Sequence, residues 1–488
     1  MIIKPLIVIH RYVGVVLGVL MTTWCLSGFV MMYQSFPATT QEERLAGLEA
    51  LNLTQCCTEL PAEAARGNVR IEMLNGNPVA RTGGRGGQQT YDLTTGEKTG
   101  TLDEAGVRRL AETFAAGNAI DGQITKLEQI RVDQWTAQTA RRSQPLWRAE
   151  FNDPGNTLVY VNASGADILS DANATERLLS WFGAIPHWLF PTVLRENQPL
   201  WYGIMTWSAA IGCFLVITGM TIGFVRLRGR SGKWWPYKRP LWMWHHMFGT
   251  FAGALVVTWT FSGLLTMQPW GLLESESTVN RGDLSSRMTW AETRPLIDQL
   301  KQQDRSDIIS IRTAPFMDNP YIIATTRDGS EIRLGSEGVA TVQQAELEAG
   351  LAAKGGLFAA GKLEVLTTED EYYYGHKRDV DLPVYRLTLS DPDETRVYFD
   401  YETGEVRRFA DATAKRFRWF ESALHRMDLP FMRSRPVWDI VTMLLLAAVT
   451  VVCATGAWLS IKRVRQDAGR VSEFVRFRLR KKPESGHQ

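Results

Sequence analysis

The chain has 488 residues, 45% of them hydrophobic, and a formal net charge of +2 at pH 7. This length exceeds what one hydrophobic core usually serves, so we expect several structural units. A net charge so close to zero gives no indication of a nucleic-acid-binding protein. The five cysteines give no pattern of a small disulfide scaffold.

Residues 1–36 predict a membrane-spanning helix. The apolar run Val13–Tyr33 is long enough to cross about 30 Å of hydrocarbon. It is too long for the apolar part of a cleaved signal peptide, and it matches an internal helix. We therefore expect it to be retained in the protein.

Residues 37–198 form the first polar segment and predict a small α+β domain. Val69–Leu74 and Thr90–Leu93 alternate as strands, and Asp103–Ala116 has helical spacing. Pro145–Phe151 and Leu158–Val161 follow as a second hairpin around an Asn-Asp-Pro-Gly turn.

The rest of the chain repeats this order. Apolar runs predict three more spans, within residues 199–225, 241–268 and 435–461. Residues 269–434 again predict an α+β domain, whose expected strands and helix are Ile309–Arg312, Glu331–Leu334, Gln343–Ala353, Pro383–Arg386 and Val397–Tyr398. The expected fold class is a membrane α-helical protein with four transmembrane helices and two α+β domains outside the membrane.

Basic residues predict the orientation. The loop 226–240 has no acid and carries Arg226, Arg228, Arg230, Lys233, Lys238 and Arg239. The tail 462–488 has nine Lys and Arg against two acids as far as Lys482. By the positive-inside rule both segments and both termini face the cytoplasm, so both polar segments face outward. Nucleic-acid binding is another reading of the tail, but orientation explains it without a further partner.

The chain is an internal duplication. The stretch from His10-Arg11 to Ser27-Gly28 recurs 235 positions later, from His245-His246 to Ser262-Gly263. The closing hairpins of the polar segments match at a spacing of 238, as from Tyr160 to Tyr398. The repeated unit is helix, polar segment, helix, which implies a pseudo-twofold axis along the membrane normal.

Four of the seven histidines occupy equivalent positions of this repeat. His10 and His245 begin spans that enter from the cytoplasm, whereas His187 and His425 precede spans that enter from outside. Facing imidazoles supply two axial nitrogens to a planar iron macrocycle, and nearby glycines give the ring room. The pattern therefore predicts two b-type haems, one near each membrane face. Histidines merely tolerated at helix ends, or a zinc or ferrous-iron site, are the alternatives.

Other residues are secondary candidates. His246, whose repeat partner is Arg11, could replace His245 as a ligand if the helix rotates. Arg11 and Arg426 each follow a proposed ligand and could hold haem propionates, although arginines at a membrane boundary also snorkel. Trp24 and Trp259 recur between the two levels, where packing competes with a role in electron transfer.

The cysteines and one aromatic segment leave alternatives open. Cys56-Cys57 could be a vicinal bridge or two free thiols, and the other three cysteines lie in spans. The segment Glu371–Arg378 concentrates aromatic and basic groups and is echoed by Trp135 with Arg141-Arg142. Such a surface suits an aromatic or anionic metal chelate, whereas the simpler reading is an aromatic strand.

These motifs resemble those of the PepSY-associated transmembrane-helix proteins. The shared features are the His-Arg-x-x-Gly start at His10, the small-residue stripe to Ser27-Gly28, its copy from His245, and the endings Thr218-Gly219 and Thr455-Gly456. Each motif is short, and their order and duplication over nearly the whole chain carry the resemblance.

The resemblance implies a function. The family includes di-haem ferric-siderophore reductases of the ferrioxamine type in the bacterial inner membrane, with four spans and periplasmic PepSY-like domains. The chain would then be a haem-dependent oxidoreductase that passes electrons to a ferric siderophore in the periplasm and releases Fe(II). Carried over by position, the axial ligands would be His10, His187, His245 and His425.

Two further questions stay open at this stage. The electron donor could be a quinol or a cytosolic reductant. A second hypothesis is a non-catalytic membrane module whose PepSY-like domains bind or regulate a peptidase or an envelope partner. A siderophore permease is disfavoured, because the four spans lack a polar central pathway.

Overall fold

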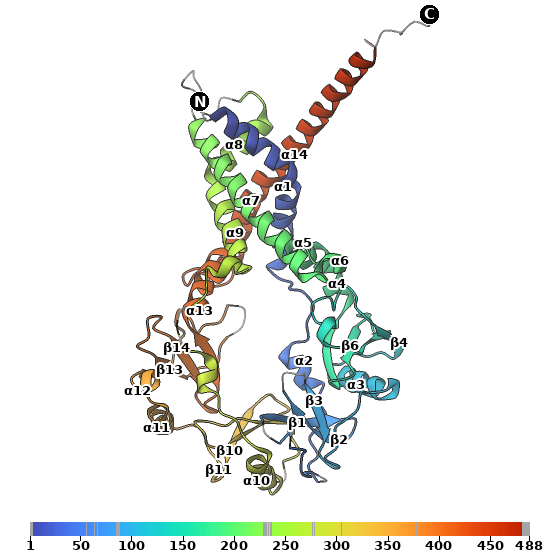
Figure 1. Ribbon diagram of the computed structural model, residues 1–488, viewed down its shortest axis with the longest axis vertical. Helices are drawn as coiled ribbons and strands as arrows, with labels where there is room; N and C mark the ends of the chain where they lie inside the picture. Colours follow the sequence, from blue (N-terminus) through green and yellow to red (C-terminus); the bar gives the residue numbers. More distant parts are fainter. Residues whose placement is uncertain are drawn as a thin grey trace, which may run out of the picture. The chain divides into compact units, whose positions relative to one another are not determined.

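The computed structural model divides the chain into two compact units (Figure 1). The helical unit contains Met1–Ser35, Leu179–Leu272 and Phe417–Gln488, and the sheet unit contains Phe36–Leu178 and Leu273–Arg416. The structure describes residues 3–54, 56–62, 64–65, 67–83, 88–227, 232, 234, 237–275, 277, 279–303, 305–376 and 379–480. Arg228, Arg230 and Lys233 of the basic loop and Lys481 and Lys482 of the tail lie outside these residues.

The helical unit has three continuous helices that are long and apolar enough to cross a membrane. They are α1 (Ile3–Met31), α7 (Gln198–Val225) and the apolar part of α14 (Val437–Arg480). The third expected span is two helices, α8 (Pro240–Phe251) and α9 (Gly253–Thr266), bent by 61°. The described residues thus contain three spanning candidates, or four if the bent pair makes one span.

The bend at Ala252 lies where another helix packs closely against the chain. A Cβ at Gly253 would lie 2.7 Å from Met220 Cγ, so α7 approaches the backbone at the bend. The Thr250 hydroxyl donates to the His246 carbonyl at 2.7 Å, but Thr22 makes the same contact with the Gly18 carbonyl in continuous α1, so this contact alone does not explain the bend. The equivalent stretch of α1 stays continuous, so the duplication does not extend to the bend.

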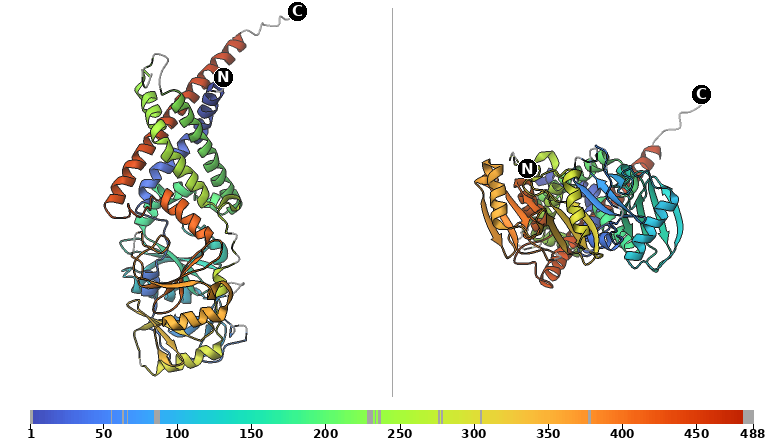
Figure 2. Two further views of the ribbon diagram at one scale, coloured as in Figure 1. Left: turned by 90° about the vertical axis from the view of Figure 1, so that its left-hand side faces the viewer. Right: turned by 90° about the horizontal axis from the view of Figure 1, so that it is seen from below.

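Packing joins the helices into one bundle. Helix α1 packs against α14 and α7, and α7 packs against α8 and α9. Their central apolar cluster comprises Leu17, Met21, Leu215, Val256, Val449 and Cys453. Figure 2 shows α14 continuing past the other helices of this unit. Shorter elements complete it: α5 (Ala184–Trp188), α6 (Thr192–Arg195) and a π-helical turn, η4 (Arg418–His425).

The sheet unit contains one seven-stranded sheet to which both polar segments contribute. Its strand order is β11-β10-β9-β8-β1-β2-β3, with antiparallel neighbours. The strands are β1 (Val69–Leu74), β2 (Asn77–Thr82), β3 (Gln89–Asp92), β8 (Ile308–Thr313), β9 (Ile322–Thr326), β10 (Glu331–Gly335) and β11 (Gly338–Val339). The halves meet where Ile71 of β1 pairs with Ile311 of β8. This pairing covers an edge that each strand would otherwise expose.

Each polar segment also builds a four-stranded sheet covered by a helix. The first has the order β4-β5-β6-β7 with α3 packed on it, and the second has β12-β13-β14-β15 with α11. The first set is α3 (Glu104–Gly117), β4 (Ile124–Ile130), β5 (Leu146–Phe151), β6 (Leu158–Asn162) and β7 (Asp167–Ala172). The second set is α11 (Gln344–Lys354), α12 (Gly356–Ala359), β12 (Lys362–Leu366), β13 (Val384–Thr388), β14 (Arg396–Asp400) and β15 (Val406–Ala410). The remaining helices are α2 (Gln41–Ala46), α10 (Trp290–Lys301), α13 (Ala412–Phe417) and α4 (Ala174–Phe182).

This arrangement differs from two separate domains at residues 37–198 and 269–434. The shared sheet makes both polar segments parts of one compact unit. Residues 179–198 and 417–434, expected in the polar domains, belong to the helical unit. The alternating pattern identified β1, β3, β5, β6, β8, β10, β13 and β14 but missed β2, β4, β7, β9, β11, β12 and β15. The pairing of β1 with β8 is a long-range choice that the pattern does not encode.

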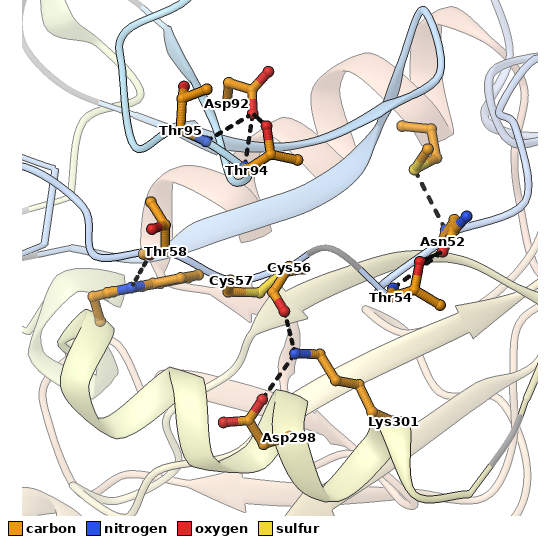
Figure 3. Close-up of a disulfide and its surroundings, with 12 residues drawn as sticks. Asn52, Thr54, Cys56, Cys57, Thr58, Asp92, Thr94, Thr95, Asp298 and Lys301 are labelled. Carbon is orange, nitrogen blue, oxygen red and sulfur yellow. Dashed lines mark hydrogen bonds and ion pairs between the residues drawn. A yellow bond between two sulfur atoms is a disulfide. The ribbon is translucent and has the colours of Figure 1, made fainter.

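Cys56 and Cys57 form a vicinal disulfide in the core of the sheet unit (Figure 3). The Trp290 indole N–H donates to the Thr58 carbonyl at 3.1 Å. The Lys301 ammonium donates to the Cys56 carbonyl and forms an ion pair with Asp298 at 2.9 Å. The structure thus contains the bridge rather than the two free thiols.

Asp171 at the end of β7 predicts a pH dependence of stability. Burial raises the pKa of its carboxyl to about 6 from 3.8, although Thr39 donates to it at 2.6 Å. The folded state therefore binds the proton more tightly than the unfolded state, so this contribution to stability falls as the pH rises from about 4 to 6. We expect Asp171→Asn to be more stable than the wild type above pH 6, with the difference shrinking toward pH 4. Thermal unfolding of both proteins at a series of pH values tests this.

Candidate cofactor site

The first histidine pair joins α1 to α8. The His10 and His245 ring centroids are 6.4 Å apart and their planes are inclined by 36°. Two imidazole nitrogens on opposite sides of one metal ion, each at about 2 Å from it, place the ring centroids roughly 6 Å apart. The observed spacing therefore suits a metal ion between the two rings.

The second pair joins α5 to the end of η4. The His187 and His425 ring centroids are 6.1 Å apart and their planes are inclined by 65°. His187 contacts Ser27, which lies seventeen residues after His10 on α1. At about 1.5 Å per residue, the two pairs are separated by roughly 25 Å along this helix.

In every case Nδ1 is held by a group on another element. His10 Nδ1 lies 3.0 Å from the Leu215 carbonyl and 3.3 Å from Thr218 Oγ1. Its repeat partner His245 makes the same contacts with the Val452 carbonyl at 3.2 Å and Thr455 Oγ1 at 3.1 Å. An Nδ1–H that donates to a carbonyl leaves the Nε2 lone pair available, which is the tautomer a metal ligand needs.

At the second pair, serine hydroxyls contact the Nδ1 atoms of the histidines. Ser27 Oγ lies 3.0 Å from His187 Nδ1, and Ser262 Oγ lies 3.1 Å from His425 Nδ1. Both serine hydroxyls also lie within hydrogen-bond distance of a tryptophan carbonyl three residues earlier. All four rings are thus oriented by an element other than their own.

Glycines give the rings their space. A Cβ at Gly219 would lie 2.6 Å from His10 Cε1, and one at Gly456 would lie 3.0 Å from His245 Cε1. At the second pair, a Cβ at Gly263 would lie 3.2 Å from His425 Cε1. The repeated Thr-Gly therefore has two functions, because threonine orients each ring of the first pair and glycine makes room for it.

The first pair lines a partly open cavity of about 290 Å³ between the helices. This volume is at the lower end of ligand pockets, which measure roughly 300–1,000 Å³. Glycines from α1, α7, α8, α9 and α14 line it, including Gly14, Gly223 and Gly249. Its basic lining residues are Arg11, Arg226, Arg239, Lys462 and Arg463. The glycines leave room for a flat apolar group, and the basic side chains suit acidic substituents at one end of that group.

The secondary candidates take different positions. His246 Nε2 lies 2.8 Å from the Gly223 carbonyl, and it is His245 whose ring faces His10. Arg11 lines the cavity of the first pair. Arg426 instead forms an ion pair with Glu421 in η4, so its guanidinium already has an acidic partner.

Trp24 and Trp259 lie between the two levels and pack at the central apolar cluster. Their indole N–H groups are buried and have no hydrogen-bond partner within the described ranges. The Trp259 ring also packs against the neighbouring cluster of Met32, Trp438 and Leu446. Packing therefore accounts for their position.

The aromatic segment from Glu371 is packed inward. Tyr373 and Tyr374 are 6% and 9% exposed, and Tyr373 stacks on Tyr398 at 5.1 Å. The Arg396 guanidinium lies 4.9 Å from the Tyr372 ring centroid. Lys377 and Arg378 lie outside the described residues. The described part of this segment is not the strand of the simpler reading, but Tyr372 and Tyr373 pack in a small core cluster with Val384 and Tyr398.

The sequence showed the four histidines but not the residues that orient them. Thr218, Thr455, Ser27 and Ser262 appeared only as repeated motif positions. Their recurrence in register with the histidines was the available clue. Within the described residues no group of three or more His, Cys, Asp or Glu side chains could hold a metal ion, which leaves zinc or ferrous iron without a full ligand set.

Comparisons with known proteins identify one family. The family model described as the PepSY-associated TM region matches residues 7–307, more than half of the chain. The match includes three of the four paired histidines. No curated protein matches the chain.

Proposed function

The chain belongs to the PepSY-associated TM family, and from this premise we propose that it is a di-haem b oxidoreductase of the bacterial inner membrane. It reduces ferric siderophores in the periplasm and releases Fe(II). In this proposal the bent pair α8 and α9 is one span, so four spans cross the membrane and both termini are cytoplasmic. The sheet unit is then periplasmic.

One observation carries this proposal: two pairs of facing imidazoles, each ring held through Nδ1 and spaced for a shared metal ion. Haem, when bound, supplies one-electron transfer without a proton-transferring side chain. His10 and His245 would bind the haem on the cytoplasmic side, and His187 and His425 the one on the periplasmic side. Thr218, Thr455, Ser27 and Ser262 orient these ligands.

The remaining residues of the first site fit the same group. The glycines around His10 and His245 leave a flat space, and the cations at the cavity suit two propionates. Arg11 is the one of these cations that belongs to the His-Arg-x-x-Gly motif, and its repeat counterpart is His246. The apolar cluster between the two levels excludes water from the path between the sites.

Purified protein tests the proposal directly. We expect a Soret band, two haems per chain in a pyridine haemochrome assay, and reoxidation of the reduced haems by a ferric siderophore. The alternative, a non-catalytic module that binds a peptidase or an envelope partner, predicts a colourless protein. Colourless protein from haem-replete cells would contradict the proposal.

Gly219→Ala tests the space around His10. The added Cβ would meet His10 Cε1 at 2.6 Å, so the ring must leave its position. Because loss of ligand orientation typically weakens metal binding about 10- to 100-fold, we expect the variant to lose most of one haem. Gly203→Ala on the same helix is the control, since its Cβ meets nothing within 4 Å. Equal haem content in the two variants would contradict this role of Gly219.

A further inference from the structure

Two cysteines from opposite ends of the chain lie side by side in the helical bundle. Cys25 on α1 and Cys453 on α14 have their sulfur atoms 3.6 Å apart, and the Cys25 thiol donates to Cys453 Sγ. Cys453 is buried, whereas Cys25 is half-buried. The third free cysteine, Cys213, lies on α7.

The backbones hold this contact in place. A Cβ at Gly18 would lie 3.2 Å from Ala457 Cα, and one at Gly28 would lie 3.3 Å from Leu446 Cδ2. The two antiparallel helices therefore approach closely on both sides of the cysteines. A disulfide needs a sulfur–sulfur distance of about 2 Å, so the two sulfur atoms would have to approach by roughly 1.6 Å.

The contact is not a product of the duplication. The repeat counterpart of Cys25 is Thr260 on α9, and that of Cys453 is Val216 on α7. Neither counterpart can be oxidised to a disulfide. The thiol pair is therefore present where α1 contacts α14 and absent from the pseudo-equivalent contact between α9 and α7.

We propose that Cys25 and Cys453 are an oxidisable dithiol whose electron acceptor is a quinone dissolved in the membrane. Both S–H bonds break and one S–S bond forms. The two electrons and two protons reduce the quinone to its hydroquinone. The product is a covalent link between α1 and α14 that a dithiol reductant can open.

The position of the two cysteines within apolar helices favours a quinone as their electron acceptor. Both cysteines lie within helices that are apolar enough to span a membrane, where charged, water-soluble oxidants do not enter. Cys25 is the half-buried partner, and its neighbour Leu26 is 54% exposed on the side of the helix that would face lipid. A quinone is apolar and accepts two electrons together with two protons, as the dithiol requires.

The link would join the two halves of the first histidine site. Helix α1 carries His10, and α14 carries Thr455 and Gly456, which orient His245 and give it room. Oxidation would fix these helices relative to each other. The dithiol reaction needs no haem, so its test is independent of the proposed function.

The test treats anaerobically purified full-length protein with decylubiquinone, a fully substituted quinone that forms no stable thiol adduct. The protein is then denatured and alkylated, and each cysteine is quantified by mass spectrometry. We expect alkylation of Cys25 and Cys453 to be lost together, with a non-reduced peptide linking them, while Cys213 stays alkylated. Hydroquinone should form in a 1:1 ratio to the linked peptide.

Matched variants make the result decisive. Cys453→Ser should leave Cys25 fully alkylated after the same treatment, and Cys213→Ser should behave as the wild type at the other two positions. Persistent alkylation of both cysteines in the wild type would overturn the proposal. So would a link that includes Cys213, or loss of Cys25 alkylation in Cys453→Ser.

Discussion

Replacing His10 or His245 with alanine is expected to leave one haem per chain instead of two. Both rings flank the same position, 6.4 Å apart, so each variant removes one of two axial ligands from the same site. The second pair lies roughly 25 Å further along α1 and shares no contact with the first. Its haem should remain bound, but it should be poorly reducible from the cytoplasmic side.

His187→Ala and His425→Ala should give the opposite result. Their rings are 6.1 Å apart at the other end of the bundle, so these variants should spare the haem of the first pair. Reduction from the cytoplasmic side should then still occur, whereas delivery to an external ferric chelate should be lost. Haemochrome counts and reduction in proteoliposomes with the chelate outside separate the two cases.

His246→Ala is the matched control for His245→Ala. The two residues are neighbours on α8, but His246 Nε2 lies 2.8 Å from the Gly223 carbonyl and its ring packs edge-on against Tyr237 at 5.1 Å. We expect His246→Ala to keep two haems. If His246→Ala lost a haem and His245→Ala did not, α8 would be rotated from the observed position. If His10→Ala and His187→Ala depleted the same haem, the pairing itself would be wrong.

The histidine pairing followed from the sequence because two regular quantities determine it. Duplication marked equivalent positions, and the rise of about 1.5 Å per residue kept His10 from sharing a metal ion with a ligand beyond the far end of its helix. The sequence did not predict which groups contact the Nδ1 atoms of these histidines. Thr218 contacts His10 across 208 residues of chain, and only the packing of α1 against α7 brings them together.

Local sequence patterns could not predict two features of the fold. The bend at Ala252 depends on Gly253 meeting Met220 of another helix, although hydropathy marks one continuous apolar run. The seven-stranded sheet depends on β1 choosing β8 as its neighbour. Alternation predicts that a strand has one buried face, but it does not predict which strand lies beside it.

The shared sheet also concentrates charge at its centre, which makes Glu72 a critical residue of the sheet unit. Its side chain on β1 is fully buried and forms ion pairs with three arginines. Arg81 Nε lies 2.9 Å from it and Arg70 Nε lies 2.9 Å from its other oxygen, with Arg44 as the third partner. Arg81 also donates to the carbonyls of Gly165 and Ala166, so the network ties β2 to the turn before β7.

Glu72→Ala is therefore expected to destabilise the sheet unit by about 3–5 kcal/mol, because it leaves the buried Arg81 guanidinium without its carboxylate. Glu72→Gln keeps the volume and one acceptor and should cost less. Glu104→Ala is the control, since its ion pair with Arg108 is exposed at 3.8 Å and worth roughly 0.5 kcal/mol or less. Hydrogen exchange of β1 and β2 peptides in the full-length protein measures each loss. If protection after Glu72→Ala fell no further than after Glu104→Ala, Glu72 would not hold the sheet together.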